Sequence, residues 1–168
     1  MTKYSKIPAS LLVVGAMLLV ATIAVLSADG SRPDFEGVWR TAEVIVPGPS
    51  PQTFKPVATL AIFHGRHYSR VEVHSEGARA ALKDPASASA DELRALWGPF
   101  VAEAGTFDLS GNVLTMQALV AKNPAAMTRG ATSVYTYQRS GDTLTLTQTR
   151  TPSGSSAMPI TVKLVRVE

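Results

Sequence analysis

The chain has 168 residues, no cysteine, and 16 Lys and Arg against 13 Asp and Glu. The lack of cysteine excludes disulfides, thiol redox chemistry and a lipid-modified cysteine anchor, so stability must come from a packed core. Setting aside Lys3 and Lys6 leaves 14 basic against 13 acidic residues, a formal +1, and no basic run interleaved with aromatic residues, so we expect no nucleic-acid binding.

Residues 1–28 have the features of an export signal. Two lysines precede an apolar run from Leu11 to Leu26, and the first acidic residue is Asp29. The segment is either a cleaved signal peptide or an uncleaved membrane anchor, because residues 7–26 number 20, close to the ~20 that span a bilayer. We therefore expect an exported protein, periplasmic or anchored facing the periplasm or the extracellular side, that meets a membrane only through this segment if uncleaved.

A linker over residues 29–34 leads into a single domain over 35–168, whose apolar or alternating runs are separated by turn signals. Such runs are typical of short antiparallel strands. Ser110-Gly111-Asn112 and Ser140-Gly141-Asp142 predict tight hairpins, because Gly, Asn and Asp readily take the positive φ that these turns require. The predicted strands are 37–46, 57–63, 67–74, 105–109, 113–121, 132–139, 143–150 and 160–167.

One segment interrupts the strand pattern and predicts a helical insertion at about 78–103. Ser89 and Glu92 have the spacing of a capping box, and Gly98-Pro99 ends or kinks the helix. The apolar stripe of this helix favours one that covers a sheet edge or a barrel end over one that binds a partner or a membrane surface. The stripe consists of Leu93, Leu96, Trp97 and Phe100.

The order of the elements predicts an all-β fold. Eight strands in meander order can close into an antiparallel up-and-down barrel, whose interior holds side chains or one small ligand. An open sandwich of the same strands is the competing architecture, because hairpin connections are compatible with both.

Five features along the chain form a recognisable series. They are Phe35–Arg40 (FEGVWR), Ala104–Asp108 (AGTFD), Asn123-Pro124 with Gly130, YTYQRSGDTLTLT and LVRV. In this series the chain resembles the bacterial lipocalin-like domain family, which implies a lipocalin-like barrel over about 35–168. Where such families often have a histidine after the second of these segments, this chain has Met116-Gln117, so the resemblance transfers no role for that histidine.

The resemblance also implies that Trp39 plugs the closed end of the barrel, with Arg166 of the last strand over its indole. The residue pattern agrees, because Arg166 shares a strand face with Ile160, Val162 and Leu164, where a charge is costly unless it is stacked and hydrogen-bonded. Gly37 lets the backbone pass close to this plug. The alternative is an ordinary core tryptophan beside a solvated arginine.

The sequence predicts no metal site, no cofactor and no catalytic residue. His64 and His67 flank a hairpin tip, while His74 lies at the far end of the next strand, up to ~23 Å away. There is no G-x-S-x-G elbow and no Gly-rich phosphate loop.

Two charged residues have alternative positions. If the strand faces that carry Glu43 and Arg70 turn inward, the two side chains can pair inside the barrel, and otherwise both are surface charges. On the alternating strands we expect an apolar and aromatic face that lines a ligand cavity or fills a solid core. The ligand-lining candidates are Tyr68, Arg70, Met116, Tyr135, Tyr137, Leu144 and Leu146.

The expected function is therefore binding of a small hydrophobic or amphipathic molecule. Two alternatives stay open: a structural or interaction domain of the cell envelope with a packed core, and a cofactor-free isomerase or cyclase that acts inside the barrel. Nothing in the sequence requires catalysis or indicates an oligomeric state.

Overall fold

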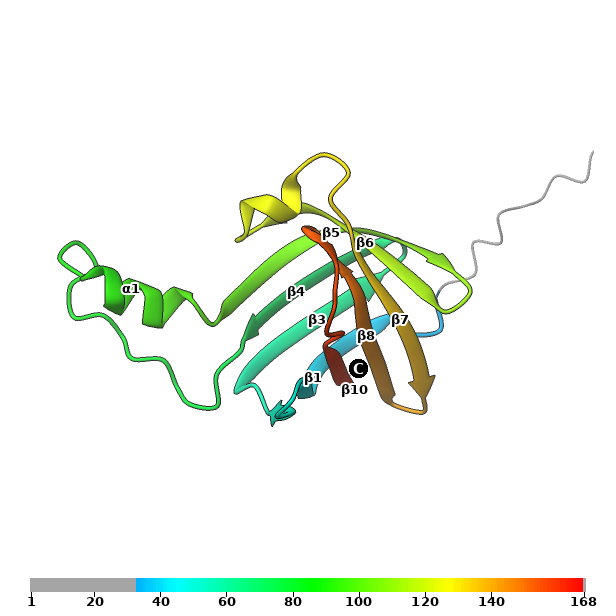
Figure 1. The fold of residues 1–168 in the computed structure, drawn as a ribbon, viewed down its shortest axis with the longest axis horizontal. Coiled ribbons are helices and arrows are strands. Elements are labelled where there is room, and N and C mark those ends of the chain that lie inside the picture. Colours follow the sequence, from blue (N-terminus) through cyan, green and yellow to red (C-terminus); the bar gives the residue numbers. More distant parts are fainter. Residues whose placement is uncertain (1–32, 168) are drawn as a thin grey trace, which may run out of the picture. The chain divides into compact units, whose positions relative to one another are not determined.

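Eight antiparallel strands in residues 33–167, the part of the chain that this computed structural model describes, pair in sequence order around a barrel (Figure 1). The barrel strands are β1 (Gly37–Val46), β3 (Ala58–His64), β4 (His67–Val73), β5 (Phe100–Ser110), β6 (Val113–Ala121), β7 (Ser133–Ser140), β8 (Thr143–Thr151) and β10 (Thr161–Arg166). The last of these strands, β10, pairs with both the first, β1, and the one before it, β8, and so closes the sheet. This closure confirms the predicted eight-stranded up-and-down barrel over the open sandwich.

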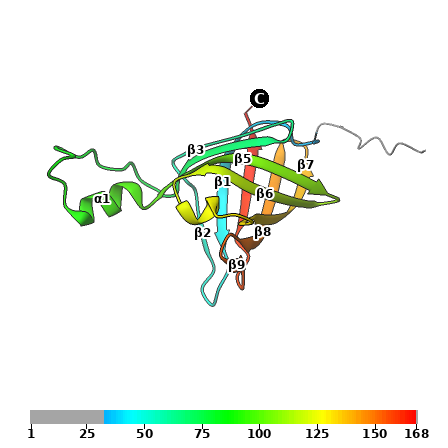
Figure 2. The same ribbon diagram turned by 90° about the horizontal axis from the view of Figure 1, so that it is seen from above.

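The two ends of the barrel differ. At one end the strands are joined by tight hairpins, in which Gly65, Gly111 and Gly141 each have a φ of 57°, a value that favours glycine. At the other end the connections are longer and carry β2 (Gln52–Phe54), β9 (Gly154–Ser155) and the 3₁₀ helix η1 (Pro124–Met127) (Figure 2). We call these the hairpin end and the open end.

An aromatic core fills the hairpin end. Phe35, just before β1, is fully buried and contacts the ring of Phe63 edge-on at 5.1 Å and that of Tyr137 at 4.9 Å between centroids. Trp39 is also fully buried beside them. Phe107, Leu114, Leu144 and Leu164 belong to the same buried cluster. The hairpin end therefore has no room for a ligand.

The helical insertion is an arm that projects from the open end (Figure 1). It contains α1 (Ala90–Trp97), which begins with the predicted capping box, since the Ser89 side chain and Glu92 bond each other's backbone. No residue of α1 is buried. The expectation that this helix covers a sheet edge or the barrel end is therefore wrong.

Strand β5 begins at Phe100, several residues before its predicted start. Val73 of β4 pairs with Phe100, and the ladder continues without interruption to His67 and Thr106. These first residues of β5 were predicted to belong to the helical insertion because of their helical spacing. They form a strand because β4 offers an unpaired edge, and tertiary pairing of this kind overrides local preference.

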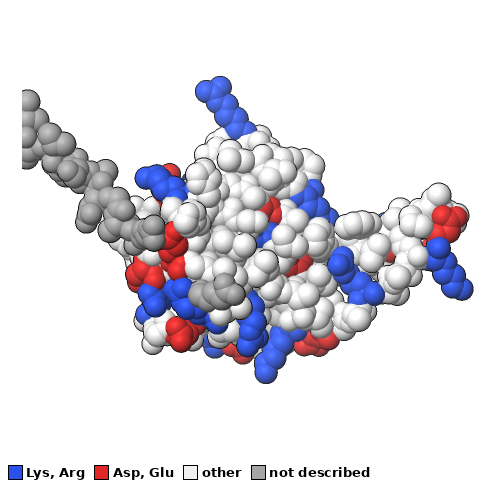
Figure 3. Space-filling model, turned by 180° about the vertical axis from the view of Figure 1, so that it is seen from behind, with Lys and Arg blue, Asp and Glu red and all other residues white. Residues whose placement is uncertain are grey.

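Two further predictions concern the N-terminal segment, which is either a signal peptide or a membrane anchor, and the charge of the surface, which indicates no nucleic-acid binding. Residues 1–28 and most of the linker lie outside the described residues. Within residues 33–167, no helix has the length and hydropathy needed to cross a bilayer. On the face in Figure 3, Lys and Arg side chains are interspersed with Asp and Glu.

Candidate functional site

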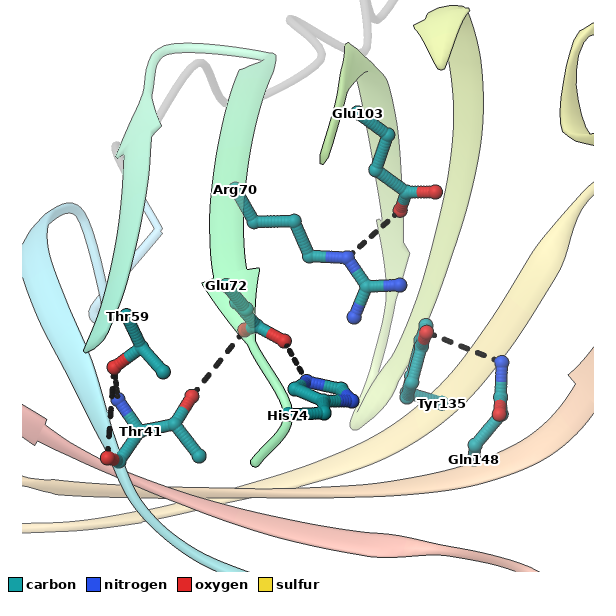
Figure 4. A network of polar contacts seen from close by, with 8 residues as sticks. All are labelled: Thr41, Thr59, Arg70, Glu72, His74, Glu103, Tyr135 and Gln148. Atoms are coloured by element: carbon teal, nitrogen blue, oxygen red, sulfur yellow. Dashed lines mark hydrogen bonds and ion pairs between the residues drawn. The ribbon is translucent and has the colours of Figure 1, made fainter. Parts of the chain in front are cut away.

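The inward face of β4 is polar toward the open end. Strand alternation places Tyr68, Arg70 and Glu72 on the same inward side, and His74 follows just after the strand (Figure 4). These four residues, together with Glu103 of β5, form what we call the polar wall. It lies opposite apolar residues of β8 and β10, so the open half of the barrel has two chemically different sides.

Arg70 and Glu103 are a cross-strand pair inside the barrel. The Arg70 Nε donates to Glu103 Oε1 at 2.9 Å, and the Tyr68 hydroxyl donates to the same oxygen at 3.3 Å. Burial lowers the pKa of Arg70, but Tyr135 and the carboxylates of Glu103 and Glu72 outweigh it and hold this pKa above its ordinary value. Burial, and then Glu103, raises the pKa of Tyr68. The arginine therefore stays charged and the phenol stays a donor.

Only one edge of the Arg70 guanidinium is used. No described residue accepts a hydrogen bond from its terminal nitrogens, Nη1 and Nη2, and in Figure 4 the one bond from Arg70 to the residues drawn leaves from Nε. The Arg70 side chain is 23% exposed, so these donors are partly desolvated. A guanidinium has five N–H donors, and most of them are unused here.

Glu72 is a buried carboxylate with two partners. Its side chain is 3% exposed, and it meets His74 Nε2 at 2.5 Å through Oε2 and accepts from the Thr41 hydroxyl at 3.2 Å through Oε1. Burial alone would raise the pKa of Glu72, but the hydrogen bond from His74 and the charge of Arg70 lower it below its usual range. Glu72 is thus ionised and holds the imidazole of His74 in a fixed orientation.

A β-bulge in β1 removes Glu43 from this site. The register with β10 shifts between Thr41 and Glu43, which turns Glu43 outward, where it accepts from Lys163 Nζ at 2.6 Å. The alternative in which Glu43 pairs with Arg70 is therefore wrong. Arg70 pairs instead with Glu103, which sequence analysis missed because it assigned that residue to the helical insertion.

The ligand-lining candidates divide into two groups. Tyr137 and Leu144 lie in the aromatic core at the hairpin end. The other five, Tyr68, Arg70, Met116, Tyr135 and Leu146, surround one internal cavity. Outside the polar wall, the Tyr135 hydroxyl accepts from Gln148 Nε2 at 3.1 Å and keeps its own proton to donate.

This cavity is small. The space open to the centres of water molecules is about 20 Å³, which is enough for an ordered water but not for a drug-sized ligand. Arg70 and Glu72 are its charged lining residues. The apolar lining residues are Ala61, Phe63, Met116, Leu146, Val162 and Leu164.

At the hairpin end the structure places Arg166 over Trp39. The guanidinium carbon lies 4.4 Å from the indole centroid, and Arg166 Nη1 donates to the Glu36 carbonyl at 2.8 Å. The Trp39 indole N–H donates to the Phe35 carbonyl at 2.8 Å. Gly37 has a φ of 140°, which side chains disfavour. These residues belong to the core and not to the candidate ligand site.

The three histidines are dispersed. His64 is exposed and pairs with Glu36 at 2.8 Å, His67 is exposed at the start of β4, and only His74 reaches the polar wall. In the described part of the chain, no group of three His, Cys, Asp or Glu side chains is placed to hold a metal ion.

Comparisons with known proteins give structural likenesses at low identity. No protein-family model matches the chain, and no curated protein matches it. A lipocalin-like protein from Bacteroides uniformis is similar, with a TM-score of 0.44 and 12% identity over 78% of this chain and 96% of the other. An uncharacterized protein from Bacteroides eggerthii has a TM-score of 0.44 and 8% identity over 79% and 99%.

Proposed function

We propose that this protein binds one small amphipathic molecule at the open end of its barrel, after export from the cytoplasm. The observation that carries this proposal is the polar wall inside the barrel, in which Arg70 has unused donors facing a cavity. These donors are only partly exposed, and a ligand that supplies acceptors would take the place of water as their hydrogen-bond partner. The apolar lining beside these donors suits the atoms next to the polar group of an amphipathic molecule, and the rest of that molecule would lie along the open end.

The second candidate is a structural domain with a packed core. The small volume of the cavity favours it, because side chains already fill most of the barrel. The two candidates differ in one measurable respect: a binding protein must accept an apolar probe at a single site, whereas a packed barrel must not.

The test is saturable binding of a neutral, environment-sensitive naphthalene dye that carries a polar group, which is expected to enter the cavity while the rings lie along the open end. For the wild type we expect one site with micromolar affinity, about −8 kcal/mol. Ala61→Leu adds bulk to the cavity lining, where Ala61 is 3% exposed, and is expected to abolish binding. Ala58→Leu makes the same change on the outward side of the same strand and should leave binding unaltered.

Circular dichroism must first show that both variants are folded, because overpacking costs about 1–3 kcal/mol. A folded wild type that binds no dye, and that shows no co-purifying mass in native mass spectrometry, would contradict the proposal and leave the structural domain. Equal binding by the two leucine variants would place the dye outside the barrel and would also contradict it.

A further inference from the structure

The geometry points to a carboxylate as the polar group of the ligand, bound end-on by Nη1 and Nη2 of Arg70 and accompanied by uptake of one proton at His74. This inference rests on the proposed function. It names the chemical class of the ligand and predicts that binding is linked to pH.

The shape of the Arg70 guanidinium suits a carboxylate. The group is planar and presents pairs of parallel N–H donors that match the two carboxylate oxygens. Glu103 occupies the Nε side of Arg70 at 2.9 Å. The end-on pair, Nη1 and Nη2, is the remaining edge that can hold a second planar oxoanion with two bonds. The Tyr135 hydroxyl, which also lines the cavity, has a proton to donate to the same group.

Binding of a carboxylate changes the charge balance of the polar wall. With neutral His74, the polar wall contains one positive side chain, Arg70, and two negative ones, Glu103 and Glu72. A bound carboxylate would add another negative charge to a partly desolvated site, which is costly. A proton on His74, 2.5 Å from Glu72, neutralises one of these charges, so the anion and the proton bind more strongly together than apart.

Every charged or titratable group near His74 belongs to this balance. Glu72 and Arg70 lie on the same strand, Glu103 comes from β5, and Tyr135 comes from β7. Two further contacts are uncharged: the Phe54 ring meets the imidazole of His74 at 6.0 Å between centroids, and the Thr41 hydroxyl donates to Glu72. His74 is the histidine of the polar wall, and its contact with Glu72 makes it the group that we propose takes up the proton.

The volume of the cavity limits which part of a ligand can enter it. A space of about 20 Å³ accommodates the oxygens of a carboxylate but not a hydrocarbon chain. The aromatic core blocks anything deeper. The ligand must therefore enter with its polar group first and leave its apolar part along the open end, near the half-buried ring of Phe54.

The experiment compares octanoate with octan-1-ol, which have the same chain length and differ in the polar group. Isothermal titration calorimetry of the full chain at pH 6, 7 and 8 keeps the octanoate ionised. We expect octanoate to bind about tenfold or more tightly than octanol at pH 6. Its affinity should fall as pH rises, by at most tenfold per pH unit for one linked proton, while octanol should bind independently of pH.

Two variants locate the effect. Arg70→Gln combined with Glu103→Gln removes both charges of the pair, and should reduce octanoate affinity to that of octanol without weakening octanol. His74→Gln should abolish the pH dependence of octanoate binding. Arg66→Gln removes an arginine that is 73% exposed outside the site and should match the wild type.

The outcomes separate this inference from the proposed function. If octanol binds the wild type as tightly as octanoate at every pH, or if His74→Gln retains the pH dependence, the inference is overturned while ligand binding stands. If neither compound nor the neutral dye binds, both fail. The wild-type comparison needs no variant, so a misfolded double variant would leave the test intact.

Discussion

Trp39 and Arg166 join the beginning and the end of the barrel through single side chains. The indole is fully buried, and both its N–H and its face have partners. Arg166 is held in turn by the Glu36 carbonyl. The hairpin end thus depends on a few side chains that interact through dispersion, a cation over a π system and hydrogen bonds at the same time.

We predict that Trp39→Ala lowers the free energy of unfolding by about 3–5 kcal/mol, as expected for a large core truncation. Arg166→Ala alone should cost less, because a cation over an indole contributes about 0.5–2 kcal/mol. The double variant should be less destabilised than the sum of the two, since both changes remove one shared contact. Urea denaturation followed by circular dichroism measures the cycle, and additive losses would contradict a stacked pair.

Gly105 is a second position that admits little change. It lies at a bulge between β5 and β6, and a Cβ atom there would come within 2.0 Å of the Gln117 carbonyl oxygen and 2.9 Å of the Ala118 Cα. Because both atoms are backbone, Gly105→Ala should destabilise the barrel by about 1–3 kcal/mol or more.

The control is Gly77→Ala in the arm, where a Cβ would meet nothing within 4 Å. We expect this variant to stay within about 0.5 kcal/mol of the wild type. Thermal unfolding of both variants tests the prediction, and similar melting temperatures would show that β5 and β6 can separate locally at low cost.

Glu72 should make the free energy of unfolding depend on pH in the acidic range. Burial is the largest single influence on its folded pKa and raises it, but the hydrogen bonds from His74 and Thr41 and the charge of Arg70 together lower this pKa below its usual range. A group of this kind contributes stability above its unfolded pKa, near 4.3, and loses that contribution as pH falls through the folded value. Glu72→Gln should therefore be less stable than the wild type at pH 7, by about 1–3 kcal/mol, with a difference that shrinks from pH 5 to pH 3.

Urea titrations at several pH values measure this difference. Glu76→Gln removes an exposed carboxylate from the arm and should follow the wild type throughout. A constant gap between Glu72→Gln and the wild type would show that the carboxylate contributes through packing and not through its charge.

At the scale of elements, the strands were largely predictable because turn residues and alternation define them locally. The predicted bounds 37–46 and 113–121 match β1 and β6. Two features depended on partners that are distant in sequence. The early start of β5 follows from its pairing with β4, and the bulge that turns Glu43 outward follows from the register with β10. The polar wall was therefore only half predictable: Arg70 was a candidate and Glu103 was not.

The arm is anchored at its base and little elsewhere. Arg79 Nη1 donates to the Leu96 carbonyl at 2.9 Å and stacks over Phe100, and Lys122 Nζ donates to the Phe100 carbonyl at 2.9 Å. An eight-residue helix is marginal without tertiary packing, and α1 buries no residue. The barrel should thus be independent of the arm.

We predict that replacing residues 77–96 with Gly-Ser-Gly leaves a folded barrel. The ends of β4 and β5 are already paired at Val73 and Phe100, so a short link can span them. The free energy of unfolding should change by less than about 1 kcal/mol, a shift of a few degrees in melting temperature. Loss of cooperative thermal unfolding would show that the arm supports the fold.

At the scale of the whole molecule, closure depends on the most distant pairing in the chain. Trp39 of β1 pairs with Arg166 of β10, and β10 also pairs with β8. Until β10 docks, β1 and β8 both present unpaired edges, and the ligand cavity lacks Val162 and Leu164. Such non-local pairing is typical of slow folding.

Because β10 lies between two strands and is the last one in the chain, it could be supplied as a separate piece. A fragment over residues 33–158 mixed with a synthetic peptide over 159–167 should reconstitute the barrel, since the peptide meets a vacant slot with hydrogen-bonding partners on both sides. Reassembly would also restore two lining residues of the cavity, Val162 and Leu164, so dye fluorescence would report it directly. The closing strand thus makes this barrel a candidate for a split reporter, in which a tagged peptide switches on a binding site.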